Sequence, residues 1–190
     1  MRASESSFKI KRAVFLDRDG VINENRQDYV KTWDEFIFMP RALESLGLLA
    51  YSEFFVVVVS NQSAIHRGLV SSAMVEEINC RMVNQVKKTG ARIDGVYYCP
   101  HIPSEACHCR KPLPGLFLRA AEDMQIDLER SYCVGDKLTD VAAGKAAGCR
   151  NILVLTGEGG KQNVDMLNGY VVAKDLWNAV DFILHDAGLV

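Results

Sequence analysis

The run of residues 54–59, two phenylalanines followed by four valines, constrains the fold of this chain most strongly. An uninterrupted aromatic and β-branched run is typical of a strand that is buried on both faces, as in a parallel sheet covered by helices. Residues 13–16 and 131–134 have the same character, and residues 95–98, 151–155 and 170–172 predict further short strands. We therefore expect a largely parallel sheet.

Helical patterns alternate with these strands. Apolar residues recur at helical spacing, or helix start and stop signals occur, in segments 40–52, 71–88, 114–124, 139–148 and 175–186. This alternation favours the α/β class, with a doubly wound, Rossmann-like parallel sheet. The 190 residues suit one domain, 1–190, in which the polar residues 1–9 form a flexible N-terminus and no segment is large enough for a cap domain.

The composition argues against two classes of partner. A net charge of −2 gives no basic footprint for nucleic acid. No apolar run approaches the ~20 residues that span a bilayer, and the polar N-terminus lacks the apolar region of a signal peptide. We therefore expect a cytoplasmic protein, monomeric, that acts on a small molecule and contacts neither nucleic acid nor membrane.

Polar residues appear abruptly where the buried strands end. Asp17 and Asp19 follow the first strand, Ser60 follows the second, and Asp136 and Lys137 follow residues 131–134. A solvated strand end would be the ordinary explanation of two aspartates alone. Because ligands bind at the carboxyl ends of strands in open α/β sheets, these groups should converge at one edge. Together they suit a hard cation and a phosphate.

A cluster of cysteines suggests a second metal. Cys99, His101, Cys107 and Cys109 offer three thiolates and one imidazole, a tetrahedral set suited to structural zinc in the loop 99–109. His108 is a competing imidazole, and reduced free cysteines are the alternative to a metal site. The remaining cysteines, at positions 80, 133 and 149, lie in apolar settings and are expected in the core.

Four segments resemble the motifs of the haloacid dehalogenase-like phosphatases, in order, over residues 14–156. Phe-Leu-Asp17-Arg-Asp19-Gly resembles the first motif, Ser60-Asn-Gln-Ser the second, Arg110-Lys-Pro the third, and Gly135-Asp-Lys the start of the fourth. The cysteine cluster directly before Arg110 resembles one branch, the D-glycero-D-manno-heptose 1,7-bisphosphate 7-phosphatases. The histidinol phosphatases are its nearest relatives.

The resemblance implies a mechanism and a role for each catalytic residue. Asp17 would be the nucleophile that forms an aspartyl phosphate, and Asp19 the general acid and base. Ser60 and Lys111 would hold the transferring phosphoryl group. Mg²⁺ would bind Asp17, Asp136 and the backbone carbonyl of Asp19.

Without a cap, loops must recognise the sugar. The planar guanidinium of Arg110 suits a second phosphate of the substrate. Lys137 is expected to order the acidic cluster or the substrate, and Asp140 to support the loop of Asp136. The candidate substrate contacts are Asn25, Arg26, Gln27, Asp28, Tyr29, Ser60, Asn61, Gln62, Ser63, Arg110, Lys111 and Lys137.

These features lead to one functional hypothesis and two alternatives. The hypothesis is a Mg²⁺-dependent phosphatase that removes the 7-phosphate of the heptose bisphosphate and carries a structural zinc. A histidinol-phosphate phosphatase is the first alternative. The second, a non-catalytic module stabilised by zinc, would predict the loss of Asp17 or Asp136, and both are present.

Overall fold

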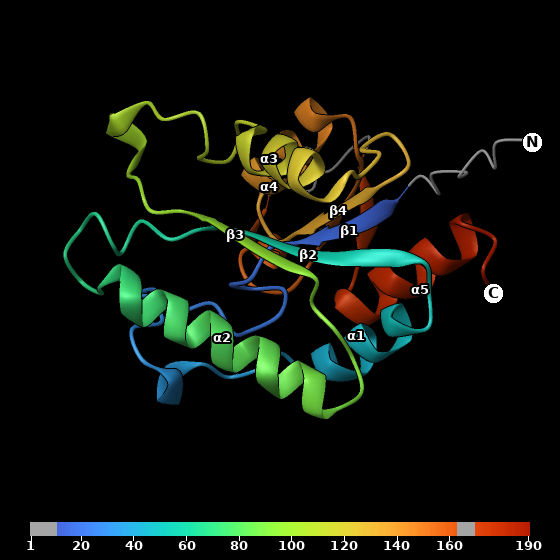
Figure 1. Cartoon of the computed structure of the whole chain (residues 1–190), viewed down its shortest axis with the longest axis horizontal. Coiled ribbons are helices and arrows are strands. Elements are labelled where there is room, and N and C mark those ends of the chain that lie inside the picture. The colour runs from blue at the N-terminus through green and yellow to red at the C-terminus, as the bar shows by residue number, and fades with distance from the viewer. Residues whose placement is uncertain (1–10, 163–169) are drawn as a thin grey trace, which may run out of the picture.

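A parallel sheet forms the centre of the molecule (Figure 1). The computed structural model describes residues 11–162 and 170–190. In this part of the chain the sheet has the order β3-β2-β1-β4-β5-β6, and all neighbouring strands are parallel. The strands are β1 (Arg12–Leu16), β2 (Phe54–Asn61), β3 (Gly95–Cys99), β4 (Tyr132–Gly135), β5 (Arg150–Val154) and β6 (Val171–Ala173). The predicted doubly wound sheet is confirmed.

Helices cover both faces of this sheet. Figure 1 shows α1 (Ala42–Ala50), α2 (Ser72–Lys88) and α5 (Leu176–Asp186) on one side. On the other side lie α3 (Gly115–Met124) and α4 (Leu138–Ala147). The short 3₁₀ helices η1 (Trp33–Glu35), η2 (Pro103–Glu105) and η3 (Gly159–Lys161) interrupt the loops.

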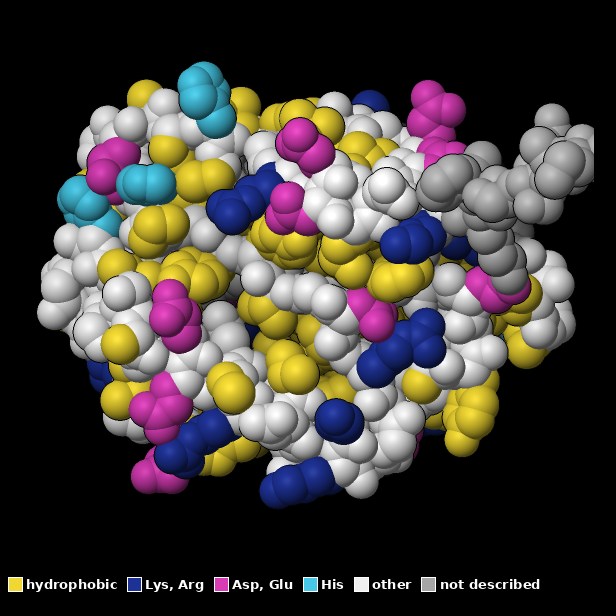
Figure 2. All heavy atoms as spheres, viewed as in Figure 1, with side chains coloured by type: hydrophobic (Ala, Val, Ile, Leu, Met, Phe, Trp, Pro, Cys, Tyr) yellow, Lys and Arg dark blue, Asp and Glu magenta, His cyan; other side chains and the backbone are white. Residues whose placement is uncertain are grey.

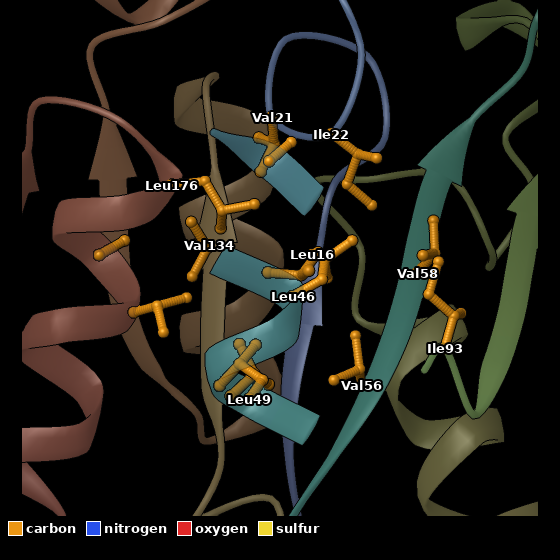
Figure 3. Close-up of a cluster of buried hydrophobic side chains, with 14 of the residues drawn as sticks. Leu16, Val21, Ile22, Leu46, Leu49, Val56, Val58, Ile93, Val134 and Leu176 are labelled. Atoms are coloured by element: carbon orange, nitrogen blue, oxygen red, sulfur yellow. The ribbon is translucent and has the colours of Figure 1, made fainter. Parts of the chain in front are cut away.

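Alternate residues of the central strands β1, β2 and β4 pack into two cores, one on each face of the sheet. Val14 and Leu16 of β1 pack with Leu46 and Leu49 of α1 in one cluster, part of which is drawn in Figure 3. Their neighbour Phe15 points to the opposite face, where it contacts Phe117 of α3. Because both faces are covered, the middle parts of these three strands are apolar, as the sequence predicted.

Most predicted helix boundaries hold to within two residues. Ser71 caps α2 by accepting a hydrogen bond from the N–H of Met74 at 3.1 Å. Pro114 is the residue before α3 rather than part of its first turn. Cys80 corrects another prediction, because it lies exposed on the outer side of α2, whereas Cys133 and Cys149 are buried. The flexible N-terminus predicted at 1–9 lies outside the described residues.

The order of the strands creates the site. From β1 the chain winds outward through β2 and β3, then crosses back to place β4 on the other side of β1. The loop after β1 therefore runs toward β2, and the loop after β4 runs in the opposite direction, toward β5. The two loops diverge at the carboxyl edge of the sheet, which is where α/β folds bind ligands. Among the described residues, no helix is long and apolar enough to cross a membrane.

Candidate active site

Asp17 lies at the end of β1, almost completely buried beside Lys111. The Lys111 ammonium donates to Asp17 Oδ1 at 2.7 Å and to the carbonyl of Val59 at 2.7 Å, and it lies 2.8 Å from Asp140 Oδ1. These contacts occupy its three N–H donors. Burial raises the pKa of Asp17, whereas the charge of Lys111 acts in the opposite direction. The prediction that Lys111 belongs to the catalytic centre is consistent with this contact to the proposed nucleophile.

Asp136 follows β4 and is fully buried at the same edge. Its Oδ2 accepts the N–H of Glu158 at 2.8 Å, but its Oδ1 is buried with no hydrogen-bond partner. Burial raises the pKa of Asp136 to about 7, and the neighbouring Asp17 carboxylate adds to this shift. A buried carboxylate oxygen without a partner, close to a second carboxylate, suits a cation as its ligand.

Two glycines allow this close packing around Asp136. Gly20 and Gly157 both have positive φ angles, of 98° and 56°. A Cβ atom at either position would lie 2.2 Å from Asp136 Oδ2. The loops after β1 and β5 can therefore close over the carboxylate only because both residues lack side chains.

Asp17, Asp136 and Asp140 place carboxylate oxygens within 4.8 Å of one another. Asp140 uses one oxygen on Lys111 and the other on the backbone N–H of Lys137, at 3.0 Å. Its carboxylate thus supports the loop of Asp136, as predicted. Asp17 and Asp136 retain the oxygens that fit Mg²⁺.

Asp19 lies at the rim of this centre. Its carboxylate accepts hydrogen bonds from Arg18, from Asn23 at 3.0 Å and from Gln62 at 2.7 Å. Burial by itself would raise the pKa of Asp19, but the charge of Arg18 and these hydrogen bonds outweigh it and lower the pKa. These contacts favour the ionised carboxylate, the form that a general base requires, so Asp19 must carry a proton before it can act as a general acid.

The second motif, residues 60–63, contacts both Asp19 and the segment that carries Lys111. Gln62 donates to Ser60 Oγ at 2.8 Å, so Ser60 is joined through one amide to Asp19. Asn61 instead binds the backbone of Lys111, donating to its carbonyl and accepting from its N–H, both at 3.1 Å. Asn61 thus attaches the third motif to the second, and Ser63 is buried beside them.

Lys137 and Arg110 are two further predicted substrate contacts. The Lys137 ammonium is partly exposed and 3.9 Å from Asp136 Oδ1. Arg110 donates to the carbonyl of His101 at 2.9 Å. Arg110 and Lys111 also line a cavity of about 270 Å³, together with Pro103, Ala106, Cys107, Pro112, Leu113 and Thr139.

Only part of the predicted recognition loop after β1 contacts the carboxylate site. Asn25 donates to the side chain of Glu158 at 3.0 Å, and the backbone N–H of Glu158 in turn donates to Asp136. Arg26 and Asp28 form an ion pair with each other, and Gln27 is exposed. Tyr29 packs against the cluster of Ala64, Val70 and Val75. The structure thus joins Asn25, but not the Arg26–Asp28 pair, to the carboxylate site.

Sequence reasoning assigned no role to several residues that build this site. Thr156 donates to the carbonyl of Gly20 at 2.6 Å, and Glu158 caps Asp136. The glycines at 157, 159 and 160, directly after a predicted strand, were the available signal for this tight loop. Arg18, for which the sequence led to no prediction, is 1% exposed.

The cysteine loop converges on a second possible metal site. His101 Nδ1 lies 3.5 Å from Cys99 Sγ and 3.3 Å from Cys109 Sγ. The sulfur atoms are separated by 3.6 Å from Cys99 to Cys107, by 3.2 Å from Cys99 to Cys109 and by 3.5 Å from Cys107 to Cys109. Ligand separations in this range fit a tetrahedral ion with metal–ligand bonds of about 2.0–2.3 Å. His108 is exposed, consistent with its exclusion from the set.

The cysteine loop also contacts the loop that follows β2. His66 Nδ1 lies 2.8 Å from a carboxylate oxygen of Glu105, which belongs to η2. Figure 2 shows histidine side chains on the end of the molecule where these loops project. On the face shown, basic and acidic side chains are interspersed.

The parallel sheet and the aspartates at its carboxyl edge define a haloacid dehalogenase-like hydrolase. A family model described as "HAD-hyrolase-like" matches residues 108–179. The D-glycero-beta-D-manno-heptose-1,7-bisphosphate 7-phosphatase of Bordetella bronchiseptica is 36% identical over 93% of this chain and 99% of its own length. The enzyme of that name from Pseudomonas aeruginosa is 40% identical over 77% of this chain and 82% of its own.

A solved structure gives the same result. The crystal structure of D,D-heptose 1,7-bisphosphate phosphatase from B. bronchiseptica, complexed with magnesium and phosphate, matches with a TM-score of 0.86 at 35% identity. The match covers 92% of this chain and 99% of that one. This chain therefore belongs to the family of D-glycero-D-manno-heptose 1,7-bisphosphate 7-phosphatases.

Proposed function

We propose that this protein is a Mg²⁺-dependent phosphatase that removes the 7-phosphate of D-glycero-β-D-manno-heptose 1,7-bisphosphate. The observation that carries the proposal is the pair of buried carboxylates at the carboxyl edge. Asp17 is held by Lys111, and Asp136 keeps a buried oxygen without a hydrogen-bond partner. Membership of the family adds the substrate, and the relatives described above favour it over histidinol phosphate.

In the first half of the reaction, a carboxylate oxygen of Asp17 attacks phosphorus. The bond from phosphorus to the sugar oxygen breaks, and Asp19 donates a proton to that oxygen as it leaves. Ser60 and Lys111 lie at the same edge and provide a hydroxyl and a cation for the phosphoryl oxygens. The product of this half is an aspartyl phosphate on Asp17.

In the second half, Asp19 removes a proton from water, and the water oxygen attacks phosphorus. The bond to Asp17 breaks, so the carboxylate is regenerated and inorganic phosphate leaves. Mg²⁺, held by Asp17, Asp136 and the carbonyl of Asp19, would offset the repulsion between Asp17 and the phosphate dianion. The buried oxygen of Asp136, which has no hydrogen-bond partner, supports this assignment.

Zinc would occupy the site of Cys99, His101, Cys107 and Cys109. All its ligands come from the protein, so its role is structural. It would fix the loop that continues directly into Arg110 and Lys111. Reduced cysteines are needed for such a site, which favours the cytoplasm as the compartment. That the protein is a monomer stays a prediction.

Arg110 would recognise the end of the substrate remote from the scissile bond. It lines the cavity beside Lys111, and its guanidinium can pair with the 1-phosphate. Histidinol phosphate offers a cationic amine at that end, which Arg110 would repel.

A phosphate-release screen tests the function. The purified protein with Mg²⁺ is given both anomers of the heptose bisphosphate, histidinol phosphate and fructose 1,6-bisphosphate, with the Asp17→Asn variant as control. We expect the β-heptose bisphosphate to have the highest kcat/KM. Equal or faster turnover of histidinol phosphate would assign the protein to the alternative function.

A further inference from the structure

Arg18 is the largest side chain that is fully buried among the described residues. Its Nη2 donates to both oxygens of Asp19 at 3.0 Å and to Gln62 Oε1 at 3.1 Å. Its Nη1 donates to Asn79 Oδ1 on α2, also at 3.1 Å. A buried guanidinium is costly to desolvate, so a side chain in this position needs such partners.

The Asp19 carboxylate is held from several directions at once. Arg18 contacts both of its oxygens, Asn23 contacts Oδ1, and Gln62 contacts Oδ2. These contacts fill the roughly four lone-pair positions of a carboxylate. One of them must therefore be given up when an oxygen takes a proton. Because Arg18 contacts both oxygens, it still holds the group through the other one.

Asn79 fixes the guanidinium from behind the site. Asn79 is 7% exposed and accepts a hydrogen bond from Arg18. The hydrogen bonds to the Asp19 carboxylate come from Arg18, Asn23 and Gln62, so Asn79 acts on Asp19 through Arg18. The planar guanidinium can bind Asn79 through one nitrogen and Asp19 and Gln62 through the other, a geometry that a lysine ammonium does not reproduce. The position of Asp19 is thereby linked to the rigid helix α2.

We propose that Arg18, anchored by Asn79, is a positioning residue that sets the reach of the Asp19 carboxyl toward the leaving oxygen of the substrate. The inference rests on the proposed function, in which Asp19 gives its proton to the sugar oxygen and later takes one from water. Arg18 itself exchanges no proton. A general acid must lie within hydrogen-bond reach of its target, and a displacement of about 1 Å can cost ~10²-fold in rate.

Two substrates separate positioning from a purely structural role. The sugar oxygen of the heptose bisphosphate needs a proton to leave, whereas the aryl oxide of 4-nitrophenyl phosphate leaves without one. The value of kcat/KM reports the steps up to departure of the leaving group. It is therefore sensitive to Asp19 with the sugar substrate and insensitive to it with the aryl substrate.

For Asn79→Ala we expect kcat/KM to fall at least ~10-fold with the heptose bisphosphate and to stay within ~3-fold with 4-nitrophenyl phosphate. For Arg18→Lys we expect kcat/KM to fall ~10²-fold with the heptose bisphosphate and, again, to change little with 4-nitrophenyl phosphate. With the aryl substrate both variants should release a burst of 4-nitrophenolate, because hydrolysis of the aspartyl phosphate still needs Asp19. Asn84→Ala, an exposed asparagine on the same helix, is the matched control and should leave both substrates unaffected.

Equal losses with both substrates in Asn79→Ala would show a structural role and overturn the proposal, as would unchanged turnover of the sugar. The result for Arg18→Lys is interpreted only if the circular dichroism of that variant matches the wild type. The result for Asn79→Ala tests the proposal even when Arg18→Lys does not fold. If the wild type cleaves the aryl phosphate but not the heptose bisphosphate, the proposed substrate is wrong. The same comparison is then made with whichever alkyl phosphate the screen identifies.

Discussion

The carboxylate site and the cysteine loop both gather ligands for a metal, but they are built in opposite ways. The carboxylates stand at the ends of buried strands, where the sheet and two glycines hold them before any ion binds. Cys99 is the buried last residue of β3, but His101, Cys107 and Cys109 lie on the loop that follows it, with the exposed helix η2 between His101 and Cys107. The fold thus makes the first site, whereas we propose that zinc makes the second.

The largest effect should come from the nucleophile. Asp17→Asn keeps the volume of the side chain but removes the attacking charge, so we expect turnover to fall by at least ~10⁴-fold. Thermal unfolding and circular dichroism should remain close to those of the wild type. Substantial turnover by folded Asp17→Asn protein would contradict the covalent mechanism.

Lys111 should matter for both stability and activity. Lys111→Met leaves Asp17 and Asp140 buried without their cation, and breaking such a pair costs about 3–5 kcal/mol. Urea unfolding measures this loss. Lys137→Met is the matched control, because that side chain is 38% exposed and its loss should change stability by less than ~1 kcal/mol. Similar losses in the two variants would show that burial is not the cause.

The cysteine loop should respond to the loss of one ligand by losing its metal. Cys107→Ser is expected to abolish the binding of about one zinc per chain, since metal affinity is coupled to local folding. We expect a loss of ~2 kcal/mol, which lowers Tm by about 4–8 °C. Cys80→Ser, outside the cluster and exposed, should retain both zinc and stability. Wild-type protein purified without chelators yet free of zinc would refute the site.

The smallest effect concerns substrate choice. Arg110→Ala should reduce the preference for the heptose bisphosphate over histidinol phosphate by about 10-fold in kcat/KM, equivalent to 1.4 kcal/mol. Zinc content, measured in parallel, checks that loss of the bond from Arg110 to the carbonyl of His101 has not opened the loop. An unchanged preference with zinc retained would remove Arg110 from substrate recognition.

The sequence predicted the parts of this molecule that depend on local pattern. Apolar strands, helix caps and strand-end aspartates are visible in a few consecutive residues, so the sheet and the edge that carries the site could be inferred. Arg18 and Asn79 could not be paired, because they lie 61 residues apart and meet only once α2 packs on the sheet. The exposed position of Cys80, by contrast, follows from local pattern, because a residue two positions from both Ile78 and Met82 lies on the side of the helix away from them.

The difference between the two sites is tested most directly by removing each metal separately and measuring turnover and Tm. Removal of Mg²⁺ should abolish turnover, which added Mg²⁺ restores, and should change Tm little. Removal of zinc should lower Tm, and Mg²⁺ alone should not restore turnover, because the loop carrying Arg110 and Lys111 is released. A protein whose Tm collapses without Mg²⁺, or which keeps its Tm and full turnover without zinc, would contradict this account.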